Sequence, residues 1–453
     1  LHLIQDDQNC LSADNLTALA YFFKISQAEV FEVASFYHHF DVVKEGSAVP
    51  PSLTVRICDG LSCSLRGAEE LAIKMKELVD PSKVRIQKVP CIGRCECAPA
   101  AQVGKRAVDC ANEDKVLKAL SGPKTPIISN YENLTDYRKK GGYTILTEVL
   151  VGKRTKESVI EIMSSSGLRG LGGAGFPAGK KWGFVLSYEG PRFMTVNGDE
   201  GEPGTFKDRF WMEKYPHQML EGSQIAAYIT GCSKIYVYMR DEYPAVIEIL
   251  KNEIKKLEMA GLQKIPIEIR RGAGAYICGE ESAMIESIEG KRGLPRHRPP
   301  YIAEVGLFNR PTLNHNIETL FWIPKILAEG PKWFSDQGYN KNHKGFRSFS
   351  VSGRVADPGI KLAPAGIPLN ELLNNYCGGM LSGHQFKAFF PGGASGGIFP
   401  ARMAELPMDF GVFEAHGGLI GSHAVVILSD KDSIRQAVLN TMRFFKHESC
   451  GQC

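Results

Sequence analysis

The sequence predicts a mixed α/β protein built from several domains, and three observations support this fold class. The chain has 453 residues, which is more than one hydrophobic core normally organises. Short apolar runs typical of strands alternate with amphipathic stretches typical of helices. Glycine clusters stand between these elements, where α/β folds place their ligand-binding turns.

The composition narrows the classes of function. Hydrophobic residues make up 43% and charged residues 23%, close to the averages of folded globular proteins. A net charge of +4 without a basic block argues against nucleic-acid binding. No run approaches the roughly 18 apolar residues of a membrane span, and the start lacks the features of a secretory signal. Twelve cysteines, several in close pairs, favour metal or cluster ligation in a reducing compartment, so we expect a cytoplasmic protein.

The first 150 residues divide into three predicted segments. Residues 1–50 form a helical unit, because residues 12–40 hold good helix formers behind an N-cap candidate in Ser12. Residues 51–120 form a compact α/β domain, with the strand "SLTVRIC", a helix, the strand "KVRIQKVP", a weaker strand "AQVGKRAVD" and a closing helix. Residues 121–150 carry two prolines, turn residues and charge without a period, which predicts a linker.

Three further segments follow the predicted linker. In residues 151–335 the runs "RFMTVN", "KIYVYMR" and "PIEIR" alternate with helical stretches, which predicts a mainly parallel sheet with crossover helices. Residues 336–425 are rich in predicted strands. The pattern of residues 426–453 predicts a helix followed by "ESCGQC". Cys450 and Cys453 in this stretch have the spacing of ligands to a metal or cluster.

Four cysteines form the clearest candidate metal site. They occur in "CDGLSC" (Cys58, Cys63) and "CIGRC" (Cys91, Cys95), and each pair follows a predicted strand. The two loops can therefore converge, and four thiolates are what a 2Fe-2S cluster requires. Zinc accepts the same four ligands. A redox disulfide is disfavoured because neither pair has the C-x-x-C spacing.

A glycine-rich stretch and two acidic loops predict a nucleotide or flavin site. In "LRGLGGAGFPAGKKWGF" the glycines allow backbone N–H groups to approach a phosphate or flavin, and a lysine adds positive charge. Carboxylates after predicted strands accept hydrogen bonds from ribose hydroxyls and repel a 2′-phosphate, which favours NAD over NADP. Singly, each acid is equally consistent with surface charge, and each aromatic with core packing. The candidates are Gly170, Gly172, Gly173, Gly175, Lys181, Asn197, Asp199, Glu200, Glu202, Glu280 and Glu281, with Phe176, Phe184 and Tyr301 for adenine stacking.

Hydrolysis and phosphoryl transfer find no support, because the chain shows no Ser-His-Asp order, P-loop or HExxH motif. Electron transfer remains as the indicated chemistry.

Two parts of the chain resemble subunits of the respiratory complex I family. Residues 12–120 resemble its small 2Fe-2S subunit through "AEVFEVASFYHHF" and the two cysteine pairs. Residues 165–453 resemble its flavin-bearing, NADH-oxidising subunit through "RGLGGAGFPAGKKW", "NGDEGEPGTFKDR", "GAYICGEES", "RPTLNHNIETL" and "ESCGQC". The resemblance implies a thioredoxin-like 2Fe-2S domain, a Rossmann-like domain for FMN and NADH, a β-grasp-like insert and the start of a helical 4Fe-4S domain.

The resemblance also assigns roles to residues that match the family's motifs. It places FMN on the glycine loop, Lys181, Asn197, Asp199, Tyr276, Gly279, Glu280, Asn316 and Thr319. It places NAD(H) on Phe176, Phe184, Glu202, Glu281 and Tyr301, with Glu202 and Glu281 positioning the nucleotide for hydride transfer without a general acid or base. This chain differs from the family at His315, which stands where asparagine is common and which we still expect among the cofactor-binding residues, and at Arg298 and Tyr301, where lysine and phenylalanine are frequent.

Finally, the resemblance implies partners. "ESCGQC" opens a 4Fe-4S motif whose other two ligands would follow residue 453. Among fused proteins of this kind, "GEESAMIESIEGKRGLPRHRPPYIAEVGLF" and "PGGASGGIFPA" look most like the beta subunit of soluble NAD-dependent formate dehydrogenases, which implies a molybdenum or tungsten alpha subunit with iron–sulfur clusters. The diaphorase subunit of a NAD-reducing hydrogenase is the alternative. Two non-enzyme alternatives are a zinc-stapled nucleotide-binding scaffold and an interaction subunit that has lost its flavin.

Overall fold

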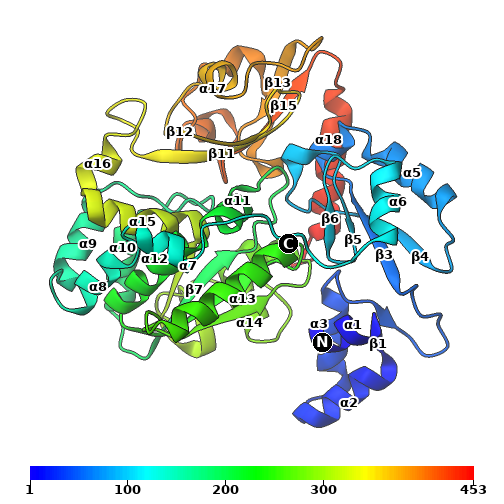
Figure 1. The fold of residues 1–453 in the computed structure, drawn as a ribbon, viewed down its shortest axis with the longest axis horizontal. Coiled ribbons are helices and arrows are strands. Elements are labelled where there is room, and N and C mark those ends of the chain that lie inside the picture. Colours follow the sequence, from blue (N-terminus) through cyan, green and yellow to red (C-terminus); the bar gives the residue numbers. More distant parts are fainter. Residues whose placement is uncertain (453) are drawn as a thin grey trace.

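The computed structural model describes residues 1–452. An N-terminal helical unit and three larger sheets with their helices succeed one another along the chain (Figure 1). The N-terminal unit lies at the lower edge of the view in Figure 1. Its elements are α1 (His2–Gln8), β1 (Leu11–Ser12), α2 (Ala13–Phe23), α3 (Gln27–Phe36) and β2 (Val42–Val43). The hydroxyl of Ser12 accepts a hydrogen bond from the backbone N–H of Asn15, so the predicted N-cap is confirmed.

A four-stranded sheet in the order β4-β3-β5-β6 follows. Its elements are β3 (Leu53–Cys58), α4 (Leu61–Ser64), α5 (Ala68–Leu78), β4 (Val84–Val89), β5 (Ala101–Val103), β6 (Arg106–Val108) and α6 (Glu113–Ser121). Strands β3 and β4 are parallel, and β5 pairs antiparallel with both β3 and β6. The single weak strand predicted over residues 101–109 is therefore a hairpin, which turns at Gly104 with φ of +60°.

The linker predicted over residues 121–150 is wrong in its second half. There the chain forms α7 (Leu134–Lys139) and α8 (Thr144–Leu150), and apolar side chains of both helices lie in the core of the following domain. Glu221 accepts hydrogen bonds from the hydroxyl of Tyr137 at 2.7 Å and from the backbone N–H of Tyr143 at 2.9 Å. These helices are too short to show a clear apolar period in the sequence. Helices of this length are stabilised by tertiary contacts rather than by local propensity.

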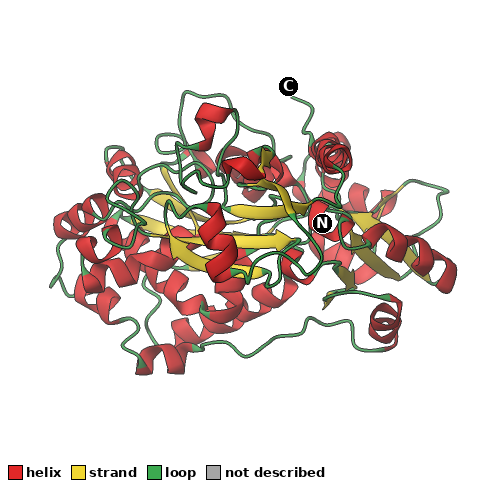
Figure 2. Ribbon diagram, turned by 90° about the horizontal axis from the view of Figure 1, so that it is seen from above, coloured by secondary structure: helices red, strands yellow, loops and turns green. Residues whose placement is uncertain are grey.

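The second sheet has four parallel strands in the order β10-β7-β8-β9, and the predicted parallel sheet is confirmed. Its strands are β7 (Arg192–Gly198), β8 (Cys232–Met239), β9 (Ile267–Arg271) and β10 (Thr312–Asn316). Helices flank these strands in the view of Figure 2. They are α9 (Lys156–Ser165), α10 (Ala178–Leu186), α11 (Lys207–Lys214), α12 (Pro216–Ile229), α13 (Pro244–Met259), α14 (Glu281–Ile288), α15 (Ile317–Glu329) and α16 (Pro331–Ser335).

The third sheet has five strands in the order β12-β11-β15-β13-β14. The elements are β11 (Phe346–Gly353), β12 (Gly359–Pro364), α17 (Leu369–Tyr376), β13 (Phe386–Phe390), β14 (Phe399–Pro400), β15 (Ala424–Ser429) and the helix α18 (Ile434–Glu448). Because β15 is a fully buried strand of this sheet, the boundary predicted at residue 425 cuts through an element and must move beyond Ser429. The predicted C-terminal helix is confirmed as α18.

The first α/β unit packs against both of the larger ones. Leu61 of α4 shares a buried cluster with Phe390 of β13 and with Ala437 of α18. Phe206, which precedes α11, belongs to the core of the first α/β unit. No helix within residues 1–452 is long and apolar enough to cross a membrane.

Candidate functional site

Four thiols meet at one end of the first α/β unit. Cys58 ends β3 and Cys63 lies in α4, while Cys91 and Cys95 follow β4, and all four side chains are buried. The sulfurs of Cys91 and Cys95 are 3.3 Å apart. Hydrogen bonding to neighbouring thiols and burial raise the pKa of Cys58, whereas the hydrogen bonds that Cys91 accepts from Cys58 and Cys95 lower the pKa of Cys91. Four converging sulfurs suit a metal or a cluster, and the exposed Cys110 lies outside the group.

A second site is a cavity of about 300 Å³ at the carboxyl ends of β7 and β10. Asn197 of β7 and Asn316 of β10 line it, together with the 3₁₀ helix Tyr276–Gly279 that follows β9. Among the candidates from the sequence, the structure places the following around this cavity: Gly172, Asn197, Glu200, Glu202, Tyr276, Gly279, Glu280 and Asn316. In parallel sheets this edge is where ligands bind.

The glycine-rich loop forms one wall of the cavity. The backbone N–H of Gly170 donates to the carbonyl of Phe176 at 2.8 Å, which folds residues 170–176 into a tight loop. The hydroxyl of Thr319 accepts a hydrogen bond from the N–H of Leu171 at 2.9 Å and so fixes the loop to α15. A Cβ atom at Gly172 would lie 3.0 Å from the side chain of Asn316. The missing side chain therefore keeps this wall open.

Two acidic side chains are held by partners on different segments. Glu202 accepts hydrogen bonds from the Tyr276 hydroxyl at 2.5 Å and from the N–H of Ser395 at 2.8 Å, and burial raises its pKa. Glu281 lies 3.6 Å from the ammonium group of Lys181 and 3.3 Å from the guanidinium of Arg298. Both carboxylates are thus oriented before any ligand binds.

Three aromatic rings, on the glycine loop, on α10 and on the segment after α14, are exposed. Phe176 is 40% exposed and Phe184 is 55% exposed, and their ring centroids are 6.0 Å apart. Tyr301 is 60% exposed, and the guanidinium of Arg298 lies 6.0 Å from its ring centroid. Exposed aromatic rings can stack on a planar base.

Comparisons with known proteins match the two parts of the chain that hold these sites. A family model described as the Nuo51 FMN-binding domain matches residues 163–325, and one described as a thioredoxin-like [2Fe-2S] ferredoxin matches residues 1–124. An NADH-quinone oxidoreductase subunit of Rhizobium meliloti is 43% identical over 330 residues, which are 71% of this chain and 78% of that protein. The chain belongs to the family of NADH dehydrogenase flavoproteins.

Two further relatives are consistent with this family. The mitochondrial NADH dehydrogenase [ubiquinone] flavoprotein 1 of Dictyostelium discoideum is 40% identical over 312 residues, covering 66% of this chain and 65% of that one. The structure of an air-oxidised NAD⁺-reducing [NiFe]-hydrogenase matches with a TM-score of 0.87 and 30% identity, covering 100% of this chain and 81% of that chain. The chain is thus a complex I-type NADH dehydrogenase flavoprotein fused to a 2Fe-2S domain, with FMN, NAD(H) and a 2Fe-2S cluster as its cofactors.

The residues present fit an FMN of this flavoprotein family. The cavity is open where a Cβ at Gly172 would stand, its walls offer the amides of Asn197 and Asn316, and Tyr276 closes one side. The buried Oδ2 atom of Asp199 has no hydrogen-bond partner among the described residues, and Asp199 belongs to a neighbouring cavity rather than to this one.

Several predicted site residues have structural roles in this flavoprotein that the sequence did not indicate. Glu200 caps α11 by accepting from the N–H groups of Asp208 and Arg209, and Glu280 caps α14. His315 does not line this cavity; its ring is buried and accepts a hydrogen bond from the indole of Trp182 at 2.7 Å. Cys450 follows α18 and is partly exposed, and Cys453 lies outside the described residues.

Sequence reasoning missed a buried ion cluster beside the cavity. Lys207 is 1% exposed, and its ammonium group lies 2.8 Å from Asp208 and 3.2 Å from Glu318. It also donates to the Oδ1 atom of Asn316 at 3.2 Å, while the amide of Asn316 donates to Asp208 at 2.6 Å. The cluster orients Asn316. The only signal in the sequence was the pair "KD" directly after the acidic loop.

Proposed function

We propose that this flavoprotein is the diaphorase subunit of a soluble, cytoplasmic NAD-dependent formate dehydrogenase and passes electrons between iron–sulfur clusters and NAD(H). The formate assignment rests on the resemblance in sequence, and the observation that carries the electron-transfer part of the proposal is the adjacency of the two sites. Arg240 donates to the carbonyl of Cys91 in the cysteine loop at 2.7 Å and to the carbonyl of Glu200 in the cavity loop at 2.8 Å. One buried side chain therefore joins the cluster loop to the flavin cavity.

The flavin, when bound, converts between the hydride of nicotinamide and the single electrons of iron–sulfur clusters. The chain's own residues bind and orient. We assign Glu202 and Glu281 to the nucleotide, because both are held in place at the cavity or its rim. We assign the exposed rings of Phe176, Phe184 and Tyr301 to the adenine. Carboxylates at this position repel a 2′-phosphate, so the proposed substrate is NADH rather than NADPH.

We assign to FMN the glycine loop, Lys181, Asn197, Tyr276, Gly279, Glu280, Asn316 and Thr319; Asp199, which the resemblance also placed there, lines the neighbouring cavity. The thiols of Cys58, Cys63, Cys91 and Cys95 are assigned to the 2Fe-2S cluster, which the match to a [2Fe-2S] ferredoxin supports over zinc. The ammonium group of Lys181 donates to the carbonyl of Asn314 at 3.1 Å, which holds it beside β10.

A 4Fe-4S cluster is the second part of the proposal. Cys450 and Cys453 would supply two thiolates, and two more would come from residues after position 453. Helix α18, which precedes Cys450, contacts the cysteine loop of the first domain, because Asn440 donates to the carbonyl of Asp59 at 2.7 Å. A chain that ends at residue 453 should keep flavin, whereas a longer natural chain should add iron and partner-linked NAD⁺ reduction. Equal iron in both would contradict this ligand assignment.

The identity of the partner subunit is open to one direct experiment. The resemblance in sequence favours a molybdenum or tungsten formate dehydrogenase subunit, and the structural match to a NAD⁺-reducing [NiFe]-hydrogenase favours the hydrogenase alternative. The protein should be purified from its source with its partners and assayed for NAD⁺ reduction with formate and with hydrogen. Formate activity with molybdenum or tungsten supports the proposal, whereas hydrogen activity with nickel selects the alternative. A colourless zinc protein without flavin would overturn both.

A further inference from the structure

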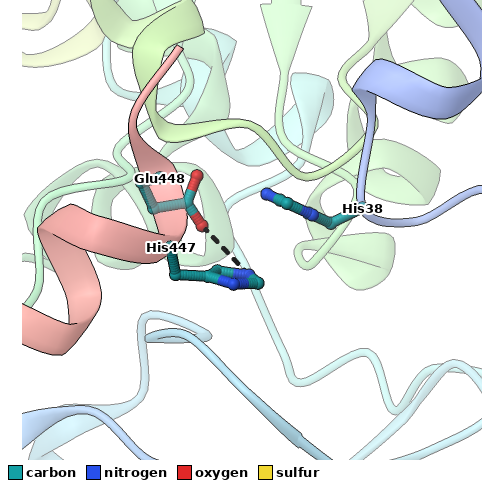
Figure 3. Close-up of side chains that lie close together, drawn as sticks. All are labelled: His38, His447 and Glu448. Atoms are coloured by element: carbon teal, nitrogen blue, oxygen red, sulfur yellow. Dashed lines mark ion pairs between the residues drawn. The ribbon is translucent and has the colours of Figure 1, made fainter. Parts of the chain in front are cut away.

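Three potential metal ligands from opposite ends of the chain meet at the surface (Figure 3). His38 follows α3 of the N-terminal unit, and His447 and Glu448 end α18. One ligand atom from each residue lies within 4.8 Å of the corresponding atoms of the other two. Figure 3 shows the two imidazoles facing each other, with the carboxylate beside them. Neither the flavin cavity nor the cysteine group includes these residues.

One loop of the flavin domain positions the backbone of His38 and the side chain of Glu448. The N–H of His38 donates to the carbonyl of Gly274 at 3.4 Å. The N–H of Tyr276, two residues further along this loop, donates to the Oε2 atom of Glu448 at 2.9 Å. Ligands that are already held in position lose little conformational freedom when an ion binds.

A neighbouring cavity of about 120 Å³ supplies an independent observation. His38, His447 and Glu448 line it together with Asp199, which is 5% exposed. The Oδ2 atom of Asp199 is buried without a hydrogen-bond partner among the described residues, so a polar atom faces this cavity unsatisfied. Arg56, Lys88 and Arg240 also line the cavity, so its interior is not purely acidic. The choice of ion therefore depends on the two imidazoles and the carboxylate of the ligand set.

We propose that His38, His447 and Glu448 form a site for a borderline divalent transition ion such as Zn²⁺, which ties the N-terminal unit to helix α18. Two imidazole nitrogens, one carboxylate oxygen and a water complete a tetrahedral shell. Ligand atoms about 2.0 to 2.1 Å from zinc lie roughly 3.3 Å apart, so the present group closes by side-chain rotation.

The geometry defines what must move. The ring centroids of His38 and His447 are 4.2 Å apart with an interplanar angle of 21°, so each ring turns about its Cβ–Cγ bond to aim a nitrogen at the ion. The side chain of His447 is 48% exposed, which leaves room for this rotation. Glu448 has a side chain only 6% exposed and keeps one oxygen on Tyr276, so its Oε1 atom is the ligand.

The test uses Zn²⁺ as the probe on the chain purified with its flavin and iron. Wild-type protein should bind one additional Zn²⁺, and X-ray absorption at the zinc edge should show nitrogen and oxygen neighbours at about 2.0 to 2.1 Å. His38→Asn and His447→Asn should each weaken zinc binding about tenfold or more. The control His416→Asn, at an exposed histidine elsewhere, should leave it unchanged.

Three outcomes would overturn the proposal. A shell of sulfur at about 2.3 Å would show that zinc occupies cysteine sites. Absence of binding to the wild type, or equal affinity in both variants, would remove the site. As a gain-of-ligand test, His38→Cys should restore zinc binding and add a single sulfur neighbour. Zinc should also raise the unfolding temperature of the wild type but not of His38→Asn, whose unfolding without zinc should match that of the wild type.

Discussion

The guanidinium group of Arg240 donates to the carbonyl oxygen of Cys91 at 2.7 Å, and through this bond the cysteine loop rests on the flavin domain. Arg240 is buried and also pairs with Glu242. Beside it, Arg209 donates to the carbonyl of Gly93 at 2.8 Å. Two arginines that bind backbone carbonyls fix the loop at defined points, so the relative position of the two sites is part of the fold.

Gly93→Ala should loosen this docking. Gly93 has φ of +69°, and a Cβ atom there would lie 2.0 Å from the hydroxyl oxygen of Tyr243, so alanine forces the loop away from the flavin domain. We expect slower reduction of the 2Fe-2S centre by NADH in freeze-quench electron paramagnetic resonance, with dye reduction largely kept. The control is Gly46→Ala, where φ is +74° and no atom lies within 4 Å. Equal effects of the two variants would show that backbone strain alone, not the docking contact, is responsible.

Glu202→Gln and Glu281→Gln should each raise the KM for NADH about tenfold or more in dye reduction, since a hydrogen bond to a charged group contributes about 1.5 to 3 kcal/mol. Flavin should stay bound, because these side chains are assigned to the nucleotide. The exposed Glu157→Gln is the control. Loss of flavin from both variants would contradict the assignment, and equal activity with NADPH would contradict the proposed repulsion of a 2′-phosphate.

Cys58→Ala should abolish the 2Fe-2S resonance while NADH-to-dye activity largely survives, since dye can take electrons at the flavin cavity. The exposed Cys110→Ser should keep the resonance. The measurement is low-temperature electron paramagnetic resonance of NADH-reduced protein, together with iron analysis. Complete loss of dye reduction in a folded Cys58→Ala protein would place this cluster on the main electron path.

Tyr137→Phe should lower the free energy of unfolding by about 1 to 3 kcal/mol, because it removes a buried hydrogen bond to the carboxylate of Glu221. Denaturant unfolding followed by tryptophan fluorescence measures this change. Tyr188→Phe, at an exposed position, should change the stability little. If Tyr137→Phe leaves the free energy of unfolding unchanged, residues 134–150 behave as the linker that their composition suggests.

Stability should fall as pH rises through the range of Glu200. Burial raises the pKa of this carboxyl to about 7 from its ordinary value of 4.5. The folded state therefore holds a proton that the unfolded state has lost, so the stabilisation is present below about pH 4.5 and is lost as pH rises to about 7. Unfolding free energies measured across this interval should fall on the order of 1 to 3 kcal/mol, and Glu200→Gln should flatten the slope. A slope unchanged by Glu200→Gln would show that other groups are responsible.

The convergence of the cysteine pairs could be predicted, because each pair directly follows a strand that the local sequence indicates. Cys58 ends β3 and Cys91 follows β4, and the ends of adjacent parallel strands must meet at one edge. The hairpin at Gly104 was missed because its strands are too short to show an alternating apolar pattern. The domain boundary was placed inside β15 because the local sequence carries little signal of which domain this strand belongs to. Lys207 was missed because nothing in its local sequence distinguishes a buried ammonium group from a solvated one.

The sequence by itself determined the fold class, the spacing of the thiols and the open glycine turn, since strand alternation, ligand spacing and the absence of a Cβ are local properties. Only the tertiary structure decided that Glu200 caps a helix, that His315 accepts a hydrogen bond from Trp182, and that His38 meets His447. The physical reason is that a polar side chain takes its role from the partner and the burial that it acquires, and those partners come from segments tens to hundreds of residues away.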